Sequence, residues 1–149
     1  MDFPIPIPFV QQLGFELHAL GDGEAELRLT IAEQHLNSWR VAHGGVVMTL
    51  LDVAMAHAAR SVNRRMLNDM PDLGPGVVTV EMKTSFMRPG EGRLRAVGRV
   101  LHRSTTMAFC EGSLIGADDQ LCAHATGTFK YLRSLPAGRQ LKTLGGQGD

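Results

Sequence analysis

The stretch from Asn37 to Asp52 contains two features that could act together in a reaction. Gly44 and Gly45 lie where a polar loop runs into an apolar segment, at the expected start of a helix. The first amides of a helix lack intrahelical acceptors and the helix dipole favours negative charge there, so this position can hold an oxyanion. Two turns later, Asp52 interrupts an otherwise apolar segment. The two features predict an oxyanion site and a buried basic carboxylate.

A desolvated carboxylate is a stronger base if it stays charged, so Asp52 could activate water. Each feature also has a structural explanation. The glycines could permit close helix–sheet packing, Asp52 could be a satisfied buried carboxylate that caps another element, and His43 could simply hydrogen-bond the loop. His57, on the same predicted helix, has no partner at metal-ligand spacing, so we expect a satisfied core or interface histidine and no metal site.

A helix from Gly45 to about Arg64 must position these groups. Its side chains are apolar nearly all round, and several alanines allow close approach by other elements. A helix of this length spans roughly 28 Å, enough to cross a small domain. The interruptions at Asp52 and His57, and its length, argue against a membrane span.

Strands are predicted on both sides of this helix. Residues 15–31 alternate between apolar and polar around a Gly-Asp-Gly turn, which predicts a hairpin, and residues 9–13 predict a short helical turn. After a predicted loop from Met66 to Gly76, turn signals separate four strand candidates: Val77–Met87, Arg93–His102, Met107–Ile115 and Leu121–Tyr131. These signals predict three consecutive hairpins and an antiparallel meander.

The predicted fold class is α+β, with one sheet curled around the helix because no other element can cover it. We expect a single domain over residues 1–133 and a flexible, Gly-rich C-terminal tail over residues 134–149. A single sheet leaves edges and apolar surface exposed, which predicts self-association.

Composition excludes several classes of protein. Fifteen basic residues balance fifteen acidic ones without a long charged block, which argues against nucleic-acid binding. Alternating prolines in residues 1–8 exclude a signal-peptide helix, so the cytoplasm is the expected compartment. In the predicted hairpin Cys110 pairs with a residue near Gly127, roughly 16 Å along the strand from Cys122, so we expect two free thiols.

Together these residues resemble a known family. Asn37, the His43-Gly44-Gly45 triplet, Asp52, the strand Val78–Met82 and the turn Phe86–Pro89 resemble hotdog-fold acyl-CoA thioesterases of the phenylacetic acid degradation type, over roughly residues 13–132. The resemblance implies a hotdog fold, in which an antiparallel β-sheet wraps around one long central α-helix. It also implies a continuous sheet across two subunits, with each active site between them.

The resemblance also implies roles for five residues. The Gly44 amide would bind the thioester carbonyl, and His43 would shape the thiolate side of the pocket. Asp52, from the neighbouring subunit, would activate water or attack as a nucleophile. Thr79 would help hold the water, and Asn37 would lie near the water and the carbonyl.

Other residues are candidates for substrate binding. Trp39 and Arg40 occupy a loop where the family often has smaller residues, which gives the acyl pocket a shape of its own. Gly45 offers a second amide, and three more side chains could line the pocket: Val47, Met48 and Met55. Arg88 or Arg103 could bind the phosphates of coenzyme A, since guanidinium groups match phosphate oxygens.

Strict alternation leaves the position of Thr79 open. It places Val78, Val80, Met82 and Phe86 on one face of the strand and Thr79 with Glu81, Lys83 and Ser85 on the other. Either the Thr79 face meets the helix of another subunit, or Thr79 lies on the surface. The resemblance favours the first.

The sequence therefore predicts a cytoplasmic acyl-CoA thioesterase that works as a homodimer or homotetramer. We expect it to need no cofactor, because coenzyme A is part of the substrate, and to bind neither nucleic acid nor membranes. Two alternatives remain: a non-catalytic acyl-CoA-binding hotdog protein, and a hotdog hydratase or dehydratase. The second is less favoured, because His43 precedes the helix without a matching dyad.

Overall fold

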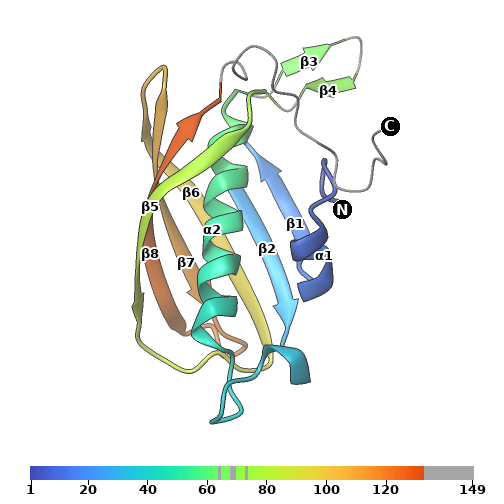
Figure 1. The fold of residues 1–149 in the computed structure, drawn as a ribbon, viewed down its shortest axis with the longest axis vertical. Helices are drawn as coiled ribbons and strands as arrows, with labels where there is room; N and C mark the ends of the chain where they lie inside the picture. Colours follow the sequence, from blue (N-terminus) through green and yellow to red (C-terminus); the bar gives the residue numbers. More distant parts are fainter. Residues whose placement is uncertain (64, 68–69, 73, 133–149) are drawn as a thin grey trace, which may run out of the picture.

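One long helix, α2 (Gly44–Ser61), lies in the concave face of a curved six-stranded sheet (Figure 1). The computed structural model describes residues 1–63, 65–67, 70–72 and 74–132. The predicted tail over residues 134–149 lies outside the described residues. The antiparallel sheet around one central helix confirms the predicted α+β hotdog architecture. Among the described helices, none is both long enough and apolar enough to span a membrane.

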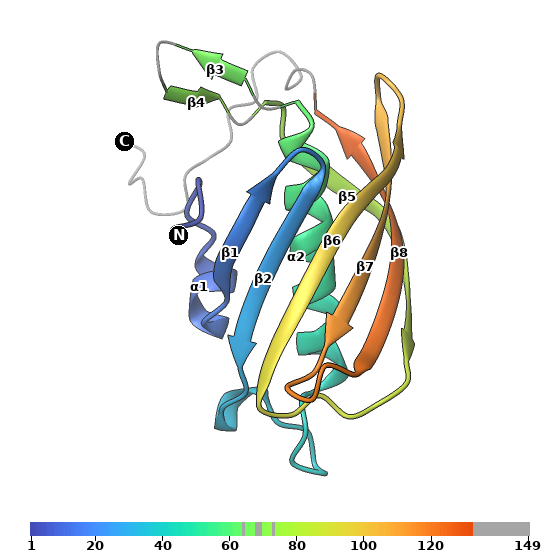
Figure 2. The ribbon, with the colours of Figure 1, turned by 180° about the vertical axis from the view of Figure 1, so that it is seen from behind.

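The sheet has the strand order β1-β2-β6-β7-β8-β5, and every neighbouring pair is antiparallel (Figure 2). Its members are β1 (Glu16–Gly21), β2 (Glu24–Thr30), β5 (Val77–Phe86), β6 (Arg93–Arg103), β7 (Met107–Ile115) and β8 (Leu121–Tyr131). The predicted strand boundaries agree with these closely. Two short helices, α1 (Pro8–Leu13) and η1 (Glu33–His35), flank the first hairpin.

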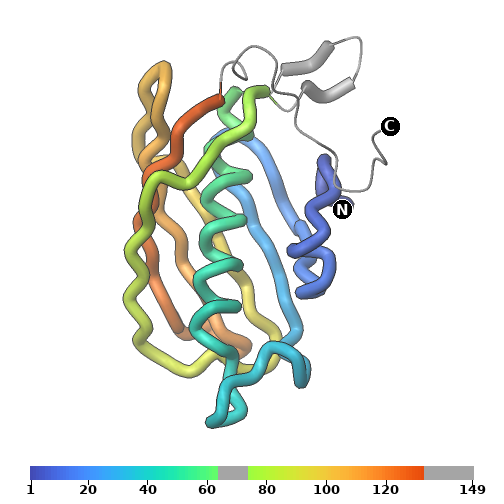
Figure 3. Tube along the Cα trace, in the orientation of Figure 1, coloured from blue at the N-terminus to red at the C-terminus, as the bar shows by residue number. Residues whose placement is uncertain are grey.

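The predicted hairpin between β5 and β6 is wrong. Strand β6 pairs with β2 on one side and β7 on the other, so β5 pairs with β8 at the edge of the sheet. The connection over residues 87–92 instead crosses the end of the molecule where α2 begins (Figure 3). There the Gly92 carbonyl accepts from the Ile31 amide and the Gly90 carbonyl from the Ala42 amide, both at 2.9 Å.

The predicted loop from Met66 to Gly76 is also partly wrong, because it overlaps a small separate hairpin. Strands β3 (Arg65–Leu67) and β4 (Met70–Asp72) form a two-stranded sheet, in which Met66 pairs with Pro71. Three residues are too few to show an alternating pattern, and a proline argues against a strand except at an edge. Both facts hid the hairpin in the sequence.

Small residues let α2 lie directly on the sheet. A Cβ atom at Gly98 in β6 would come within 2.4 Å of the Ala54 backbone, so no side chain fits at this crossing. Ala54, Ala58 and Ala59 are fully buried, as the alanine content of the helix predicted. Larger helix and sheet side chains fill the space on either side of this contact, among them Leu50, Leu51, Met55, Leu94, Leu114 and Phe129.

Strand β5 contains a bulge that reverses its alternation. Thr79 pairs with Phe129 and Glu81 with Thr128, so Val80 is an extra residue between them. Directly opposed residues share a face, so Thr79 lies on the side of the buried Phe129, toward the helix of its own chain. The prediction that Val78 and Val80 share a face with Met82 is wrong, because one inserted residue exchanges the faces.

The two cysteines behave as expected. Cys110 pairs with Gly127 across β7 and β8, and both Cys110 and Cys122 are free, buried thiols. Burial raises the pKa of Cys110 to about 12, which keeps it protonated near neutral pH.

Candidate active site

The N-terminal end of α2 is capped by His43. Its Nδ1 accepts from the Gly45 amide at 2.8 Å, and its carbonyl accepts from the amides of Val46 and Val47 at 2.9 and 3.1 Å. The Gly45 amide is therefore used within the chain, and it does not offer the second oxyanion donor that the sequence suggested. His43 acts here as a capping residue, with its ring at the surface.

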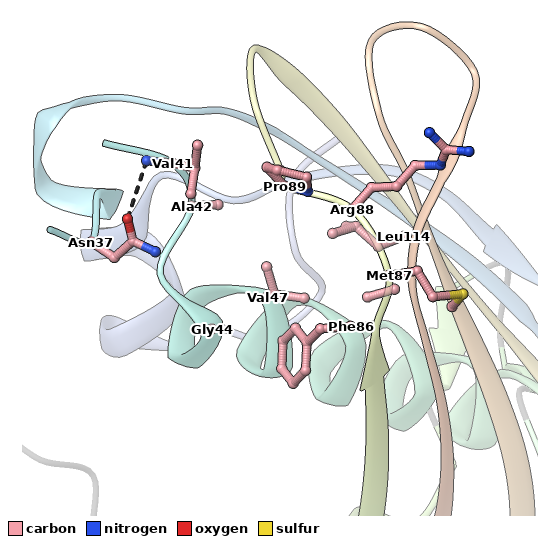
Figure 4. Close-up of a pocket in the computed structure, with 12 residues that line it drawn as sticks. Asn37, Val41, Ala42, Gly44, Val47, Phe86, Met87, Arg88, Pro89 and Leu114 are labelled. Atoms are coloured by element: carbon pink, nitrogen blue, oxygen red, sulfur yellow. Dashed lines mark hydrogen bonds between the residues drawn. The ribbon is translucent and has the colours of Figure 1, made fainter. Parts of the chain in front are cut away.

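Gly44 is the exception at this helix end. Within the described part of the chain its amide N–H has no acceptor, although the amides at positions 45, 46 and 47 all have one. Gly44 lines a cavity of about 430 Å³ between the helix end, the loop before it and the residues that follow β5 (Figure 4). A residue with an unused amide donor at a helix N-terminus thus borders open space.

The wall of this cavity is mostly apolar. Among the described residues that line it, Asn37 and Arg88 are the only ones with a charged or amide side chain, and the rest of the lining comes from Val41, Ala42, Val47, Phe86, Met87, Pro89, Leu114 and Ala123, with glycines 44 and 90. The Phe86 ring stands closest to the helix end, because its Cε1 would lie 3.6 Å from a Cβ atom on Gly44. The cavity suits an apolar group placed beside one polar donor.

Asn37 shapes the loop and faces the cavity. Its side-chain Oδ1 accepts from the backbone amides of Trp39 at 2.9 Å and Val41 at 3.3 Å. The backbone N–H of Asn37 donates to the Val41 carbonyl. These bonds leave the side-chain nitrogen without a partner among the described residues, on the side of the group away from the Val41 bond (Figure 4). Asn37 can therefore donate to a ligand without giving up its loop contacts.

Asp52 and Thr79 form a second polar pair, away from this cavity. The Thr79 hydroxyl donates to Oδ1 of Asp52 at 2.7 Å within the same chain. Burial raises the pKa of the Asp52 carboxyl, and the hydrogen bond from Thr79 opposes that shift in part. Asp52 follows Gly44 by eight residues, about 12 Å of helix rise, so within one chain the carboxylate does not line the Gly44 cavity.

The structure bears on the open question about Thr79. In the single chain Thr79 is exposed, as the second alternative expected, and its hydroxyl also contacts the helix of its own chain. The bulge at Val80 causes this contact, since it turns Thr79 toward α2. A contact with the helix of another subunit stays a prediction.

The other predicted binding residues are scattered. Val47 and Arg88 line the cavity, whereas Trp39, with 83% of its surface exposed, and Met48 lie outside its lining. Met55 is fully buried against Gly112 and Gly127, so the structure makes it a core residue and not a pocket residue.

Arg103 is also separate from the cavity. It lies at the last residue of β6 and donates to Oδ1 of Asn63, just beyond the C-terminal end of α2. The cavity is at the opposite end of the helix, so within one chain Arg103 lies away from Gly44, and its role in binding the phosphates of coenzyme A stays a prediction.

Sequence reasoning missed most of the cavity wall. Phe86 is the last residue of β5, Met87 and Pro89 come from the connection after it, and Leu114 and Ala123 come from the ends of β7 and β8. The Phe86–Pro89 turn served as a mark of the family, but only Arg88 was assigned a role. The sequence did not show the path of the connection after β5. That connection passes the start of α2 only because β5 pairs with β8.

His57 fulfils the expectation of a satisfied core histidine. Its Nδ1 lies 2.8 Å from the Val53 carbonyl, and its ring meets Phe3 edge-on at a centroid distance of 5.3 Å. Burial lowers the pKa of His57, so the ring is neutral near neutral pH.

Comparison with known proteins shows which family has this fold. The family model of the thioesterase superfamily matches residues 40–123, which include the helix start, Asp52 and strands β5 to β7. The chain belongs to the thioesterase superfamily. The "Putative esterase SSO2140" of Saccharolobus solfataricus is 30% identical to this chain over 116 residues, covering 77% of this chain and 76% of that protein.

Solved structures support the same assignment. The conserved protein PA5202 from Pseudomonas aeruginosa is 32% identical with a TM-score of 0.74, over 85% of this chain and 95% of that one. A mutant of the phenylacetic acid degradation protein PaaI from Thermus thermophilus is 25% identical with a TM-score of 0.72, over 85% and 100%. The resemblance to hotdog thioesterases is thus confirmed at the level of family and fold.

Proposed function

We propose that this member of the thioesterase superfamily hydrolyses an acyl- or aryl-acyl-CoA thioester to the free acid and coenzyme A. One observation carries the proposal: the Gly44 amide, at the N-terminus of an 18-residue helix, opens into an apolar cavity without an acceptor among the described residues. Thioester hydrolysis needs such a donor, because attack on the carbonyl carbon places negative charge on its oxygen. A preorganised donor of this kind commonly stabilises a transition state by roughly 3–4 kcal/mol.

The carboxylate that activates water comes, in this proposal, from a second copy of the chain. Two features support that arrangement. About 12 Å of helix separates Gly44 from Asp52, and Asp52 is bound to Thr79 on β5, an edge strand of the sheet. A second copy that pairs along β5 brings its Asp52 toward the first copy's Gly44, so that each homodimer has two sites.

In the proposed reaction, Asp52 takes a proton from water as the water oxygen bonds to the thioester carbon. The carbonyl oxygen becomes an oxyanion that accepts the Gly44 N–H. When the oxyanion collapses, the carbon–sulfur bond breaks and the proton passes to the thiolate, which leaves as free coenzyme A. Thr79 orients the Asp52 carboxylate, and Asn37 donates to the water or to the carbonyl oxygen.

The cavity wall supports an apolar acyl group. Its apolar side chains offer no partner for a charged or hydroxylated acyl chain, apart from Asn37 and Arg88 at its margin. We assign Arg88 to the phosphates of coenzyme A, because no side-chain ion pair occupies its guanidinium among the described residues. Arg103 has no part in this assignment.

Thiol release from a panel of aliphatic, 3-hydroxy and aromatic CoA esters tests the function. We expect release from aliphatic or aromatic esters and less from 3-hydroxy esters. Tight binding of CoA esters without thiol release would contradict hydrolysis and indicate an acyl-CoA-binding protein instead.

A further inference from the structure

The segments that build the Gly44 end of α2 meet at one residue, His35. It closes the short helix η1 and is 2% exposed. A buried imidazole is costly unless its ring nitrogens have partners. The partners of His35 therefore show what the residue holds in place.

Both ring nitrogens of His35 bond to backbone groups. Nδ1 accepts from the Ala32 amide at 2.9 Å, and Nε2 lies 2.7 Å from the Leu13 carbonyl oxygen. An amide N–H can only donate and a carbonyl can only accept, so the two contacts together require the neutral tautomer with its proton on Nε2. The ring thus joins the end of α1 to the start of η1.

The backbone of His35 extends this connection to the catalytic end of the helix. Its carbonyl accepts from the His43 amide at 2.8 Å. His43 is the N-cap of α2, and the next residue is Gly44. The bridge between Leu36 and Ala42 runs beside this bond, so the loop closes on itself directly before the helix.

We infer that His35 is a positioning residue that sets the direction of the Gly44 amide, an inference that rests on the proposed thioesterase function. His35 does not line the cavity and touches no reacting group. It acts through His43, because the peptide plane that carries the Gly44 N–H begins at the His43 carbonyl carbon. A displacement of about 1 Å in such a donor can cost a hundredfold in rate.

Two substitutions at His35 and one control separate positioning from general stability. His35→Leu removes both ring contacts at a similar side-chain size. His35→Asn keeps an acceptor close to the position of Nδ1, so it retains the contact with Ala32. The control is Tyr131→Phe, which removes another buried bond to the backbone, from the Tyr131 hydroxyl to the Ala59 carbonyl at the far end of the same helix.

The kinetic test compares kcat and KM among folded variants. We expect His35→Leu to lower kcat about tenfold to a hundredfold relative to Tyr131→Phe with little change in KM, because the amide acts mainly in the transition state. His35→Asn should recover part of the loss. Equal kcat values for His35→Leu and Tyr131→Phe would overturn the inference, and if His35→Leu does not fold, the same comparison with His35→Asn decides.

An amide readout tests positioning without turnover. In ¹H–¹⁵N spectra the Gly44 resonance should shift in His35→Leu and stay in place in Tyr131→Phe. A Gly44 resonance that does not move would overturn the inference. If the wild-type protein hydrolyses no thioester while Gly44 still responds to His35, the proposed function fails and the link between His35 and Gly44 stands.

Discussion

The two ends of α2 are completed in different ways. At the C-terminal end, two side chains bind the backbone: Ser61, the last residue of the helix, and Tyr131 of β8. The Ser61 hydroxyl donates to the Ala58 carbonyl and accepts from the Gly23 amide, each at 2.8 Å, and the Tyr131 hydroxyl donates to the Ala59 carbonyl at 2.7 Å. These bonds are buried, and they fix the helix end against the turn between β1 and β2 and against β8.

At the N-terminal end, the described part of the chain binds every early amide except one. His43 satisfies the amides of Gly45, Val46 and Val47, while Gly44 faces the cavity. A polar group left without a partner costs about 1–3 kcal/mol where it is removed from water. The contrast shows that the chain can close a helix end with its own side chains. In the proposed function, the donor left open at the other end binds the carbonyl oxygen of the substrate.

The largest expected effect is that of Asp52→Asn, which tests whether the open end works with a carboxylate. We expect kcat to fall about 10²–10⁴-fold, because the general base is lost. The fold should persist, since a neutral amide avoids the desolvation that raises the pKa of Asp52 and can still accept from Thr79.

Steady-state thiol release measures the expected fall in kcat, and thermal unfolding measures whether the fold persists. Asp119→Asn, at an exposed turn between β7 and β8, removes a carboxylate that does not line the cavity and pairs with Arg95, so it serves as the control. Near-normal turnover by Asp52→Asn would rule out the proposed mechanism.

A smaller effect is expected from Thr79→Val. The hydrogen bond from Thr79 lowers the pKa of Asp52, while burial raises it. Without the hydroxyl the pKa rises further, so the acid limb of the kcat/KM profile should move to higher pH, by about one unit or less. A limb that stays in place or moves to lower pH would show that Asp52 does not govern it.

Thr128→Val is the matched control for this pH profile. The Thr128 hydroxyl donates to the Glu81 carboxylate at 2.6 Å, also between two neighbouring elements but on the other face of the sheet. It should leave the acid limb unchanged.

The smallest effect on activity is expected at the closed end of the helix. Tyr131→Phe leaves the buried Ala59 carbonyl without its partner, which should lower the free energy of unfolding by about 1–3 kcal/mol. The cavity is at the other end, so kcat/KM should stay unchanged at temperatures where the protein is folded. Urea unfolding measures the free energy of unfolding, and thiol release measures kcat/KM. A large loss of kcat/KM would contradict the claim that only the N-terminal end of α2 takes part in the reaction.

The sequence predicted the elements well and their pairing less well. Apolar periodicity identified the long helix and six strands, because a buried face leaves a regular pattern. It could not place β5, since the Pro89–Gly92 turn signal fits a hairpin and a crossover equally. Strand β5 cannot pair with β6, because β2 and β7 already pair with the two sides of β6. The β2–β6 pairing joins residues that are distant in sequence, so a local pattern does not show it.

The sequence predicted the polar residues of the candidate site better than it predicted their contacts. Residue types indicated that Gly44 and Asn37 lie at the helix start and that Asp52 is a partly buried carboxylate on the helix, as the structure has them. The role of Asp52 in the reaction stays a prediction. The bulge at Val80, which turns Thr79 toward Asp52, leaves no mark in an alternating pattern. The sequence also did not indicate the capping bond from the Gly45 amide to His43. Two adjacent glycines suggest two unbonded amides, and only the structure shows that one of them binds the His43 ring.

The central claim is that the Gly44 amide is the oxyanion donor, and Gly44→Pro tests it most directly. Proline at the first helical position replaces the N–H by its ring and fits a helix there. His43, with φ −58° and ψ 137°, already has a conformation that a following proline allows. Gly44→Ala is the control, because it adds a Cβ atom in ordinary contact with Phe86 and keeps the amide.

The measurement is kcat for thiol release by the two folded variants. We expect the kcat of Gly44→Pro to be about 10²–10³-fold lower than that of Gly44→Ala, the usual cost of losing one oxyanion donor. Equal kcat values for the two variants would contradict it.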